Sequence, residues 1–97
     1  MRTRPRIYAD LSKIDINGNV ILSCVGTRRD LENMNLVLAE GMQLTLYMDS
    51  DVDEFGSPDN LLVDGFVKFD KDNDRWLAQI DRDTYRHDSD ERNNENE

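Results

Sequence analysis

Apolar and polar residues alternate with a period of two along most of the chain, and this alternation is typical of half-buried β-strands. An apolar run over residues 20–25 follows Asn17 and Gly18, a pair that favours a two-residue type I′ hairpin turn. We therefore expect Ile14 opposite Ile21 across that turn. The predicted buried faces consist of Ile7, Ala9 and Leu11; Leu44, Leu46 and Met48; Val63, Gly65, Val67 and Phe69; and Trp76, Ala78 and Ile80.

One segment has helical spacing instead of alternation. Leu31 and Met34 lie three residues apart, which predicts a short helix over residues 28–34. Thr27 followed by Asp30 resembles a capping box at the start of this helix, with Asp in place of the usual Glu. The Thr27 side chain is then expected to accept a hydrogen bond from the first turn of the helix.

Together these elements predict a mainly β fold. Two strands, a short helix and three further strands, separated by turn residues, are typical of small barrels and sandwiches. Closure of the sheet would cover the edges of consecutive antiparallel strands. We therefore predict a small five-stranded antiparallel barrel with one short helix. Residues 35–42 either continue the helix or form an extended segment that turns at Gly41, and the last hairpin turns at Asp72 and Asn73.

Composition places this fold in one acidic domain. The 97 residues include 12 Lys plus Arg and 21 Asp plus Glu, for a formal net charge of −9, and the length fits a single domain. We expect a flexible basic arm at residues 1–5, a folded domain at 6–87 and a disordered acidic tail at 88–97. Because no apolar run reaches the ~18 residues of a membrane helix and no signal-peptide pattern opens the chain, we expect a soluble cytoplasmic protein.

Residue patterns typical of catalysis are missing from the sequence. The single Cys24 lies in an apolar run, where an inert, buried thiol is expected, and the single His87 lies in the polar C-terminal segment. The glycines are isolated, so no phosphate-binding loop is present. The many carboxylates lie in hydrophilic loops where burial would not raise a pKa. We therefore expect no enzyme activity.

The acidic loop over residues 49–60 is the strongest candidate for binding a partner. An exposed Phe55 in an acidic segment can anchor a protein with a basic surface, because charge speeds the encounter and the aromatic ring supplies the buried contact. Phe55 folded back onto the end of the barrel is the alternative. Two tyrosines on the polar faces of their strands could add an exposed aromatic patch. The predicted partner-binding residues are Phe55, Asp51, Asp53, Glu54, Tyr47 and Tyr8.

Two triplets of alternating aspartates raise the alternative of weak calcium binding at the loop 49–60 or at residues 70–81, because alternate acids in a tight loop can converge on a hard cation. The second triplet overlays part of a helix–loop–helix calcium loop. Arg75 stands where that loop needs glycine, however, and the flanking residues alternate like strands. Acidic hairpin loops that keep a small barrel soluble are the simpler interpretation. The candidate metal ligands are Asp70, Asp72, Asp74 and Asp81.

Two further kinds of partner can be weighed from the sequence. An edge strand over residues 43–48 could pair with its copy to form a homodimer, which leaves monomer and dimer both open. The basic clusters at residues 1–6 and 28–29 could contact phosphate, but a net charge of −9 argues against binding to nucleic acid. The predicted function is therefore a small acidic protein-interaction module.

The chain also resembles a group of short, uncharacterised bacterial proteins over about residues 6–87. The segments that carry the resemblance are RIYAD at 6–10, GT at 26–27, DL at 30–31, LAEGM at 38–42, LY at 46–47, DG at 64–65 and WLA at 76–78. The run from residue 40 to residue 78 is similar to the hairpins of Src-homology-three-like barrels. The resemblance implies a bacterial, cytoplasmic, barrel-like protein, and it implies no activity and no binding residues.

Overall fold

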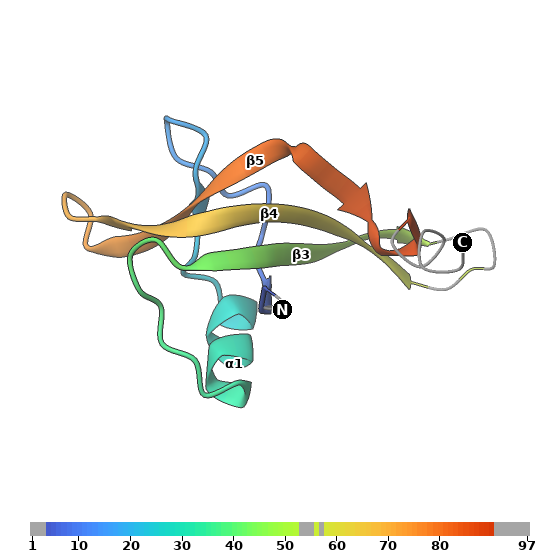
Figure 1. The fold of residues 1–97 in the computed structure, drawn as a ribbon, viewed down its shortest axis with the longest axis horizontal. Helices are drawn as coiled ribbons and strands as arrows, with labels where there is room; N and C mark the ends of the chain where they lie inside the picture. The colour runs from blue at the N-terminus through green and yellow to red at the C-terminus, as the bar shows by residue number, and fades with distance from the viewer. Residues whose placement is uncertain (1–3, 53–55, 57, 91–97) are drawn as a thin grey trace.

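The computed structural model describes residues 4–52, 56 and 58–90. Three long strands form its centre, with two short strands and one helix around them (Figure 1). The elements are β1 (Arg6–Tyr8), β2 (Val20–Ile21), α1 (Val25–Asn33), β3 (Gln43–Val52), β4 (Pro58–Asp70) and β5 (Arg75–His87). No helix in the described part of the chain is long and apolar enough to cross a membrane.

The strands form one mixed sheet in the order β1-β3-β4-β5-β2, and this sheet curves into a half-barrel. The predicted mainly β fold and its five strands are confirmed, but the structure has two small helices where one was predicted, since residues 88–90 are helical as well as α1. The prediction of a closed, fully antiparallel barrel is wrong, because β1 runs parallel to β3. β1 and β2 have only three and two residues and lie at opposite edges of the sheet, so they do not pair to close it.

The core lies on the face of the sheet that the alternating pattern predicted. Beyond that pattern, Leu62 and Leu77 are also buried, although they belong to the opposite face. The extended segment before β3 turns at Gly41 with a φ of 82° and places Leu38 in the core. The core cluster consists of Ile7, Ala9, Val20, Leu22, Leu38, Leu44, Leu46, Val63, Val67 and Ala78.

The turn at Asn17 and Gly18 differs from the predicted type I′ hairpin. The N–H of Gly18 donates to the carbonyl of Asp15 (3.1 Å), and only Gly18 of the pair has a positive φ, of 83°. The result is a longer loop with glycine in the left-handed position. The Asp15 carboxylate favours this loop, because it accepts hydrogen bonds from the N–H groups of Asn17 and Asn19, at 2.9 Å each.

The structure also differs from the predictions in the pairing of Ile14 and in the length of the acidic loop. Ile14 bridges Val20 and not Ile21, since the longer turn shifts the pairing by one residue. The predicted acidic loop over residues 49–60 is shorter than expected, because β3 and β4 pair through most of it and leave only residues 53–57 between them. The strand pattern was hidden there by acidic side chains, which are depleted in typical strands.

Helix α1 covers the outer edge of β1 through two side chains. Thr27, which is fully buried, donates from Oγ1 to the carbonyl of Tyr8 (2.6 Å), and Asp30 Oδ2 accepts from the N–H of Tyr8 (2.8 Å). These bonds satisfy the backbone groups that an edge strand leaves unpaired. The predicted capping box is therefore wrong. The helix begins earlier, after Cys24 as N-cap, and no side chain caps it.

The described parts of the predicted arm and tail contact the sheet. The carbonyl of Pro5 accepts from the N–H of Thr45 (2.9 Å). Residues 88–90 are helical, and Ser89 donates from its N–H and its hydroxyl to the Asp59 carboxylate, at 3.0 and 2.7 Å. These contacts join Pro5 and Ser89 to the sheet.

Candidate functional site

Most of the predicted acidic-loop site lies outside the described residues. This applies to Asp53, Glu54 and Phe55. Asp51 has its backbone in β3, opposite Asp59, while its side chain is not described. Binding through this loop therefore stays a prediction.

Tyr8 and Tyr47 form a packed pair beside α1 and not an open aromatic patch. Their ring centroids are 5.6 Å apart in an edge-to-face arrangement, and both residues are half-buried. A Cβ atom at Gly26 would collide with the Tyr8 ring, so glycine lets the helix approach it. The Tyr47 hydroxyl donates to Asp30 (2.6 Å), and this hydrogen bond, together with burial, raises the pKa of Tyr47 to about 12. The pair holds the helix on the sheet.

The four candidate calcium ligands do not come together. Asp70 accepts hydrogen bonds from Asn73 (2.8 Å) and Arg75 (3.2 Å). Asp81 lies opposite Asp64 in the middle of the sheet, six residues along β5 from Arg75, which is about 20 Å in an extended strand. Asp72 and Asp74 are exposed in the hairpin turn. Among the described residues, no group of three His, Cys, Asp or Glu side chains is arranged to hold a metal ion.

The turn from Asp70 to Arg75 gives a pH-dependent contribution to stability. The hydrogen bond from Asn73, with a further one from Arg75, lowers the pKa of the folded Asp70. Its contribution is therefore complete above the unfolded pKa of about 3.9 and is lost as the pH falls through the lower folded pKa. We expect the difference in unfolding free energy between the wild type and Asp70→Asn to be constant near pH 7 and to shrink below pH ~4. Urea unfolding at several pH values measures it; a difference that grows in acid would contradict the assignment.

Cys24 also differs from its expected environment. It is half-buried at the start of α1 and not in a buried strand, and its Sγ lies 3.1 Å from the Thr27 hydroxyl. Burial pushes the pKa of this thiol up, but its contact with Thr27 and hydrogen bonds from neighbouring backbone groups outweigh it and lower the pKa. The thiol is therefore more easily ionised than the inert cysteine that the sequence predicted.

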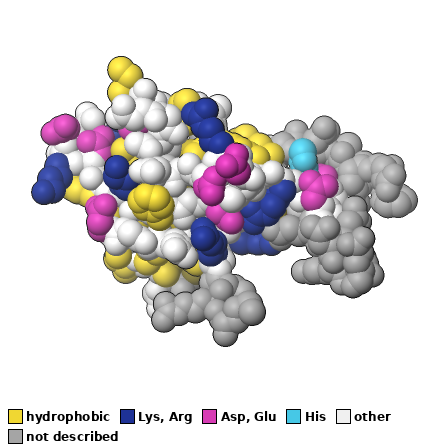
Figure 2. All heavy atoms as spheres, turned by 45° about the horizontal axis from the view of Figure 1, so that its top comes forward, with side chains coloured by type: hydrophobic (Ala, Val, Ile, Leu, Met, Phe, Trp, Pro, Cys, Tyr) yellow, Lys and Arg dark blue, Asp and Glu magenta, His cyan; other side chains and the backbone are white. Residues whose placement is uncertain are grey.

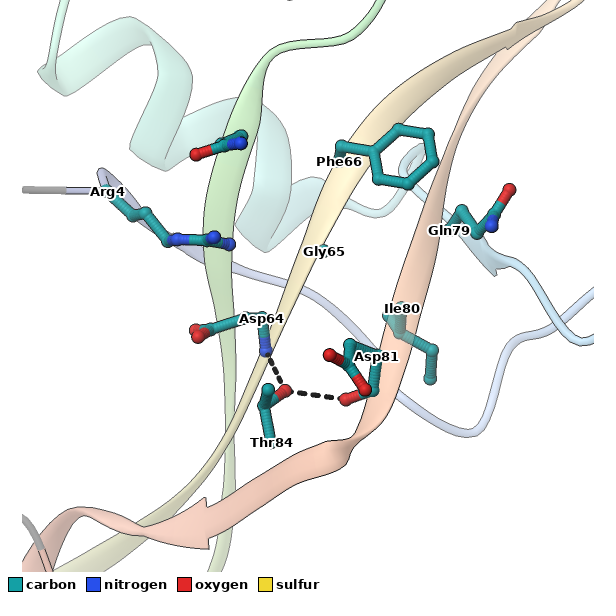
Figure 3. A pocket seen from close by; sticks show the side chains of 9 residues that line it. Arg4, Asp64, Gly65, Phe66, Gln79, Ile80, Asp81 and Thr84 are labelled. Atoms are coloured by element: carbon teal, nitrogen blue, oxygen red, sulfur yellow. Dashed lines mark hydrogen bonds between the residues drawn. The ribbon is translucent and has the colours of Figure 1, made fainter.

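The candidate binding site is a hollow of about 420 Å³ on the sheet face opposite the core (Figure 3). Gln43, Phe66 and Gln79 lie in one row across β3, β4 and β5, because the register places them side by side. Phe66 is 38% exposed at the centre of this row. The lining residues are Arg4, Gln43, Asp64, Gly65, Phe66, Gln79, Ile80, Asp81 and Thr84.

A large bulge in β5, in which several residues oppose one residue of β4, shapes one side of this hollow. Residues 82–85 lie between the partners of Leu62 and Asp64, where β4 supplies a single residue, and β5 bends sharply there (Figure 1). Thr84 anchors the bulge, since its Oγ1 donates to the Asp81 carbonyl (2.6 Å) and accepts from the Asp64 N–H (2.8 Å), as Figure 3 shows.

The polar groups of the hollow can both donate and accept hydrogen bonds. Asp64 Oδ1 accepts from Thr45 (2.8 Å) and Arg86 (3.2 Å), so this carboxylate is held by the protein itself. The exposed amides of Gln43 and Gln79 offer both donors and acceptors. The lining residues include no histidine or cysteine that could act as a base or nucleophile beside Asp81.

The sequence contains a signal for this site that went unused. Phe66 is out of phase with Val63, Val67 and Phe69, so the period of two already places it on the polar face of β4. Sequence reasoning considered only tyrosines on such faces. On the side of the molecule drawn in Figure 2, acidic, basic and apolar side chains are interspersed.

Comparisons with known proteins found no match. No family model matches the chain, and no curated protein or solved structure is significantly similar to it. The resemblance to short bacterial proteins therefore stays a prediction, and the function is argued from the geometry alone.

Proposed function

We propose that this protein is a non-catalytic interaction module that binds another protein through the face around Phe66. This Phe66 face comprises Gln43, Asp64, Phe66, Gln79 and Asp81. The observation that supports it most is the exposed Phe66 ring, seated in a hollow and flanked by two carboxamides on neighbouring strands. Aromatic anchors surrounded by polar groups carry much of the binding energy in protein interfaces.

The surroundings of the Phe66 face support the same proposal. β3, β4 and β5 pair over long stretches, so the face is rigid and loses little entropy on binding. The amides of Gln43 and Gln79 can pair with the backbone of an extended segment. The net charge of −9 favours a partner with a basic surface.

The test is capture of partners from a lysate of the cells that produce the protein, with wild-type and Phe66→Ala protein as baits. We expect at least one protein to bind the wild type and to be retained at least tenfold less by Phe66→Ala. Tyr85→Ala is the matched control, because Tyr85 is 40% exposed but does not line the hollow. Quantitative mass spectrometry measures the retained protein.

Two results would contradict the proposal. One is equal retention of every captured protein by wild-type and Phe66→Ala baits, and the other is an equal loss with Tyr85→Ala, since a general loss of exposed aromatic surface would then explain the effect. Circular dichroism of both variants checks that the fold is kept.

The homodimer predicted from edge pairing has less support. Residues 45–47 of β3 pair with β1 on one side and with β4 on the other, so the middle of the segment 43–48 is not a free edge. A dimer through this segment would have to displace β1, which α1 holds through Thr27 and Asp30.

A further inference from the structure

A second hollow, also of about 420 Å³, lies beside the first, between the loop of residues 17–19 and strands β4 and β5. Its lining combines two cationic side chains, Lys68 and Arg82, with three carboxamides, Asn17, Asn19 and Gln79. No Asp or Glu is among its lining residues, although the chain carries 21 of them. The hollow is therefore locally basic in an acidic protein.

Both cations lack a protein partner among the described residues. Neither Lys68 nor Arg82 forms a salt bridge or hydrogen bond there. Two of the acids in the flanking turns are engaged elsewhere: Asp15 accepts from the N–H groups of Asn17 and Asn19, and Asp70 accepts from Asn73 and Arg75. Two positive charges thus line one hollow to which no Asp or Glu side chain contributes.

The fold brings these groups together from three separate segments. Lys68 comes from β4, and Arg82 comes from the start of the β5 bulge. Gly18 lets the guanidinium lie against the loop, because a Cβ atom there would stand 2.9 Å from Arg82 Nη2. The bulge and the glycine turn therefore place the guanidinium beside the loop.

We propose that this hollow binds a small oxyanion, with inorganic phosphate or a phosphate monoester as the chemical class. A guanidinium can bind two phosphate oxygens at once, an ammonium adds a point charge, and carboxamide N–H groups supply neutral donors. This site does not depend on the proposed protein partner. It shares Gln79 with the Phe66 face but has Lys68 and Arg82 as its own residues.

The test is a titration of the ¹⁵N-labelled protein with sodium phosphate, followed in the amide NMR spectrum while sodium chloride keeps the ionic strength constant. We expect saturable shifts at residues 17–19, 68, 79 and 82. The double variant Lys68→Gln with Arg82→Gln should bind phosphate at least tenfold more weakly. The control double variant, Lys71→Gln with Arg28→Gln, removes the same charge from exposed positions outside the hollow and should bind like the wild type.

Linear shifts spread along the chain would overturn the proposal, because they would mean screening of a charged surface. Equal weakening in both double variants would overturn it too, since net charge alone would then explain the binding. The single variant Lys68→Gln tests the site again if the double variant loses its folded spectrum. A parallel titration with glycerol 1-phosphate identifies the source: binding of both probes means that the hollow accepts an esterified phosphate, and binding of inorganic phosphate alone restricts it to the free ion.

Discussion

Replacing Asp30 with alanine is expected to lower the free energy of unfolding by about 3 kcal/mol. One carboxylate oxygen of Asp30 accepts from the N–H of Tyr8 and from the hydroxyl of Tyr47. Hydrogen bonds to a charged group contribute roughly 1.5–3 kcal/mol each, and their loss leaves both donors without this acceptor. The change also uncovers the edge of β1, which is only three residues long. Urea unfolding measures the loss.

Glu32→Ala is the matched control for this experiment, because Glu32 is an exposed acid on the same helix. We expect it to change stability by no more than about 0.5 kcal/mol. Combining Asp30→Ala with Tyr47→Phe should cost less than the sum of the two single changes, since both remove the same hydrogen bond. Additive costs, or a near-neutral Asp30→Ala, would mean that α1 does not lock the edge of β1.

Trp76→Ala is expected to lower the free energy of unfolding by about 3 kcal/mol, near the lower end for loss of a large aromatic side chain. The Trp76 ring packs against the core cluster and lies 4.8 Å from the Phe69 ring, centroid to centroid, but it is not fully buried. A small domain has an unfolding free energy of only about 5–15 kcal/mol. Thermal and urea unfolding should therefore both show a marked loss.

Phe66→Ala provides the contrast, because Phe66 lies on the opposite, exposed face of the same sheet. We expect it to cost less than about 1 kcal/mol. A similar loss in both variants would mean that the two faces of the sheet contribute alike, and the assignment of one face to the core and the other to binding would then be wrong.

The alternating pattern predicted well which side chains face the core. It predicted poorly how the strands pair. It placed Ile7, Leu46 and Val67 correctly in the core, because side chains alternate in any strand. Alternation contains no information on strand direction, so the parallel pairing of β1 with β3 could not be read from it. Closure was inferred only from the need to cover edges, whereas the protein covers the edge of β1 with a helix.

Local motifs were ambiguous for a related reason. Thr27 and Asp30 suit a capping box because their oxygens bind backbone groups, and the same chemistry serves equally well on a neighbouring strand. Asn17 and Gly18 were located correctly as a turn, but the type of turn depended on the side chain of Asp15. In each case the residue type indicated a hydrogen bond, and only the fold decided its partner.

The proposed oxyanion hollow was harder to predict than the core. Lys68, Gln79 and Arg82 are far apart in sequence from Asn17, and they meet only because β5 pairs with β4 and the hairpin loop lies over both. The acid triplets, by contrast, were obvious in sequence, yet the register separates Asp81 from the turn that holds Asp70. The spacing of residues along the chain predicts a site only when all residues of that site lie in one local element.

The most direct test of the Phe66 face is an amide NMR spectrum of the labelled protein mixed with the purified protein that wild-type bait captures. We predict that the largest shifts fall on residues 43, 64–66 and 79–81, at the centre of the sheet. Shifts confined to α1, or to other positions away from this face, would contradict the proposed binding surface.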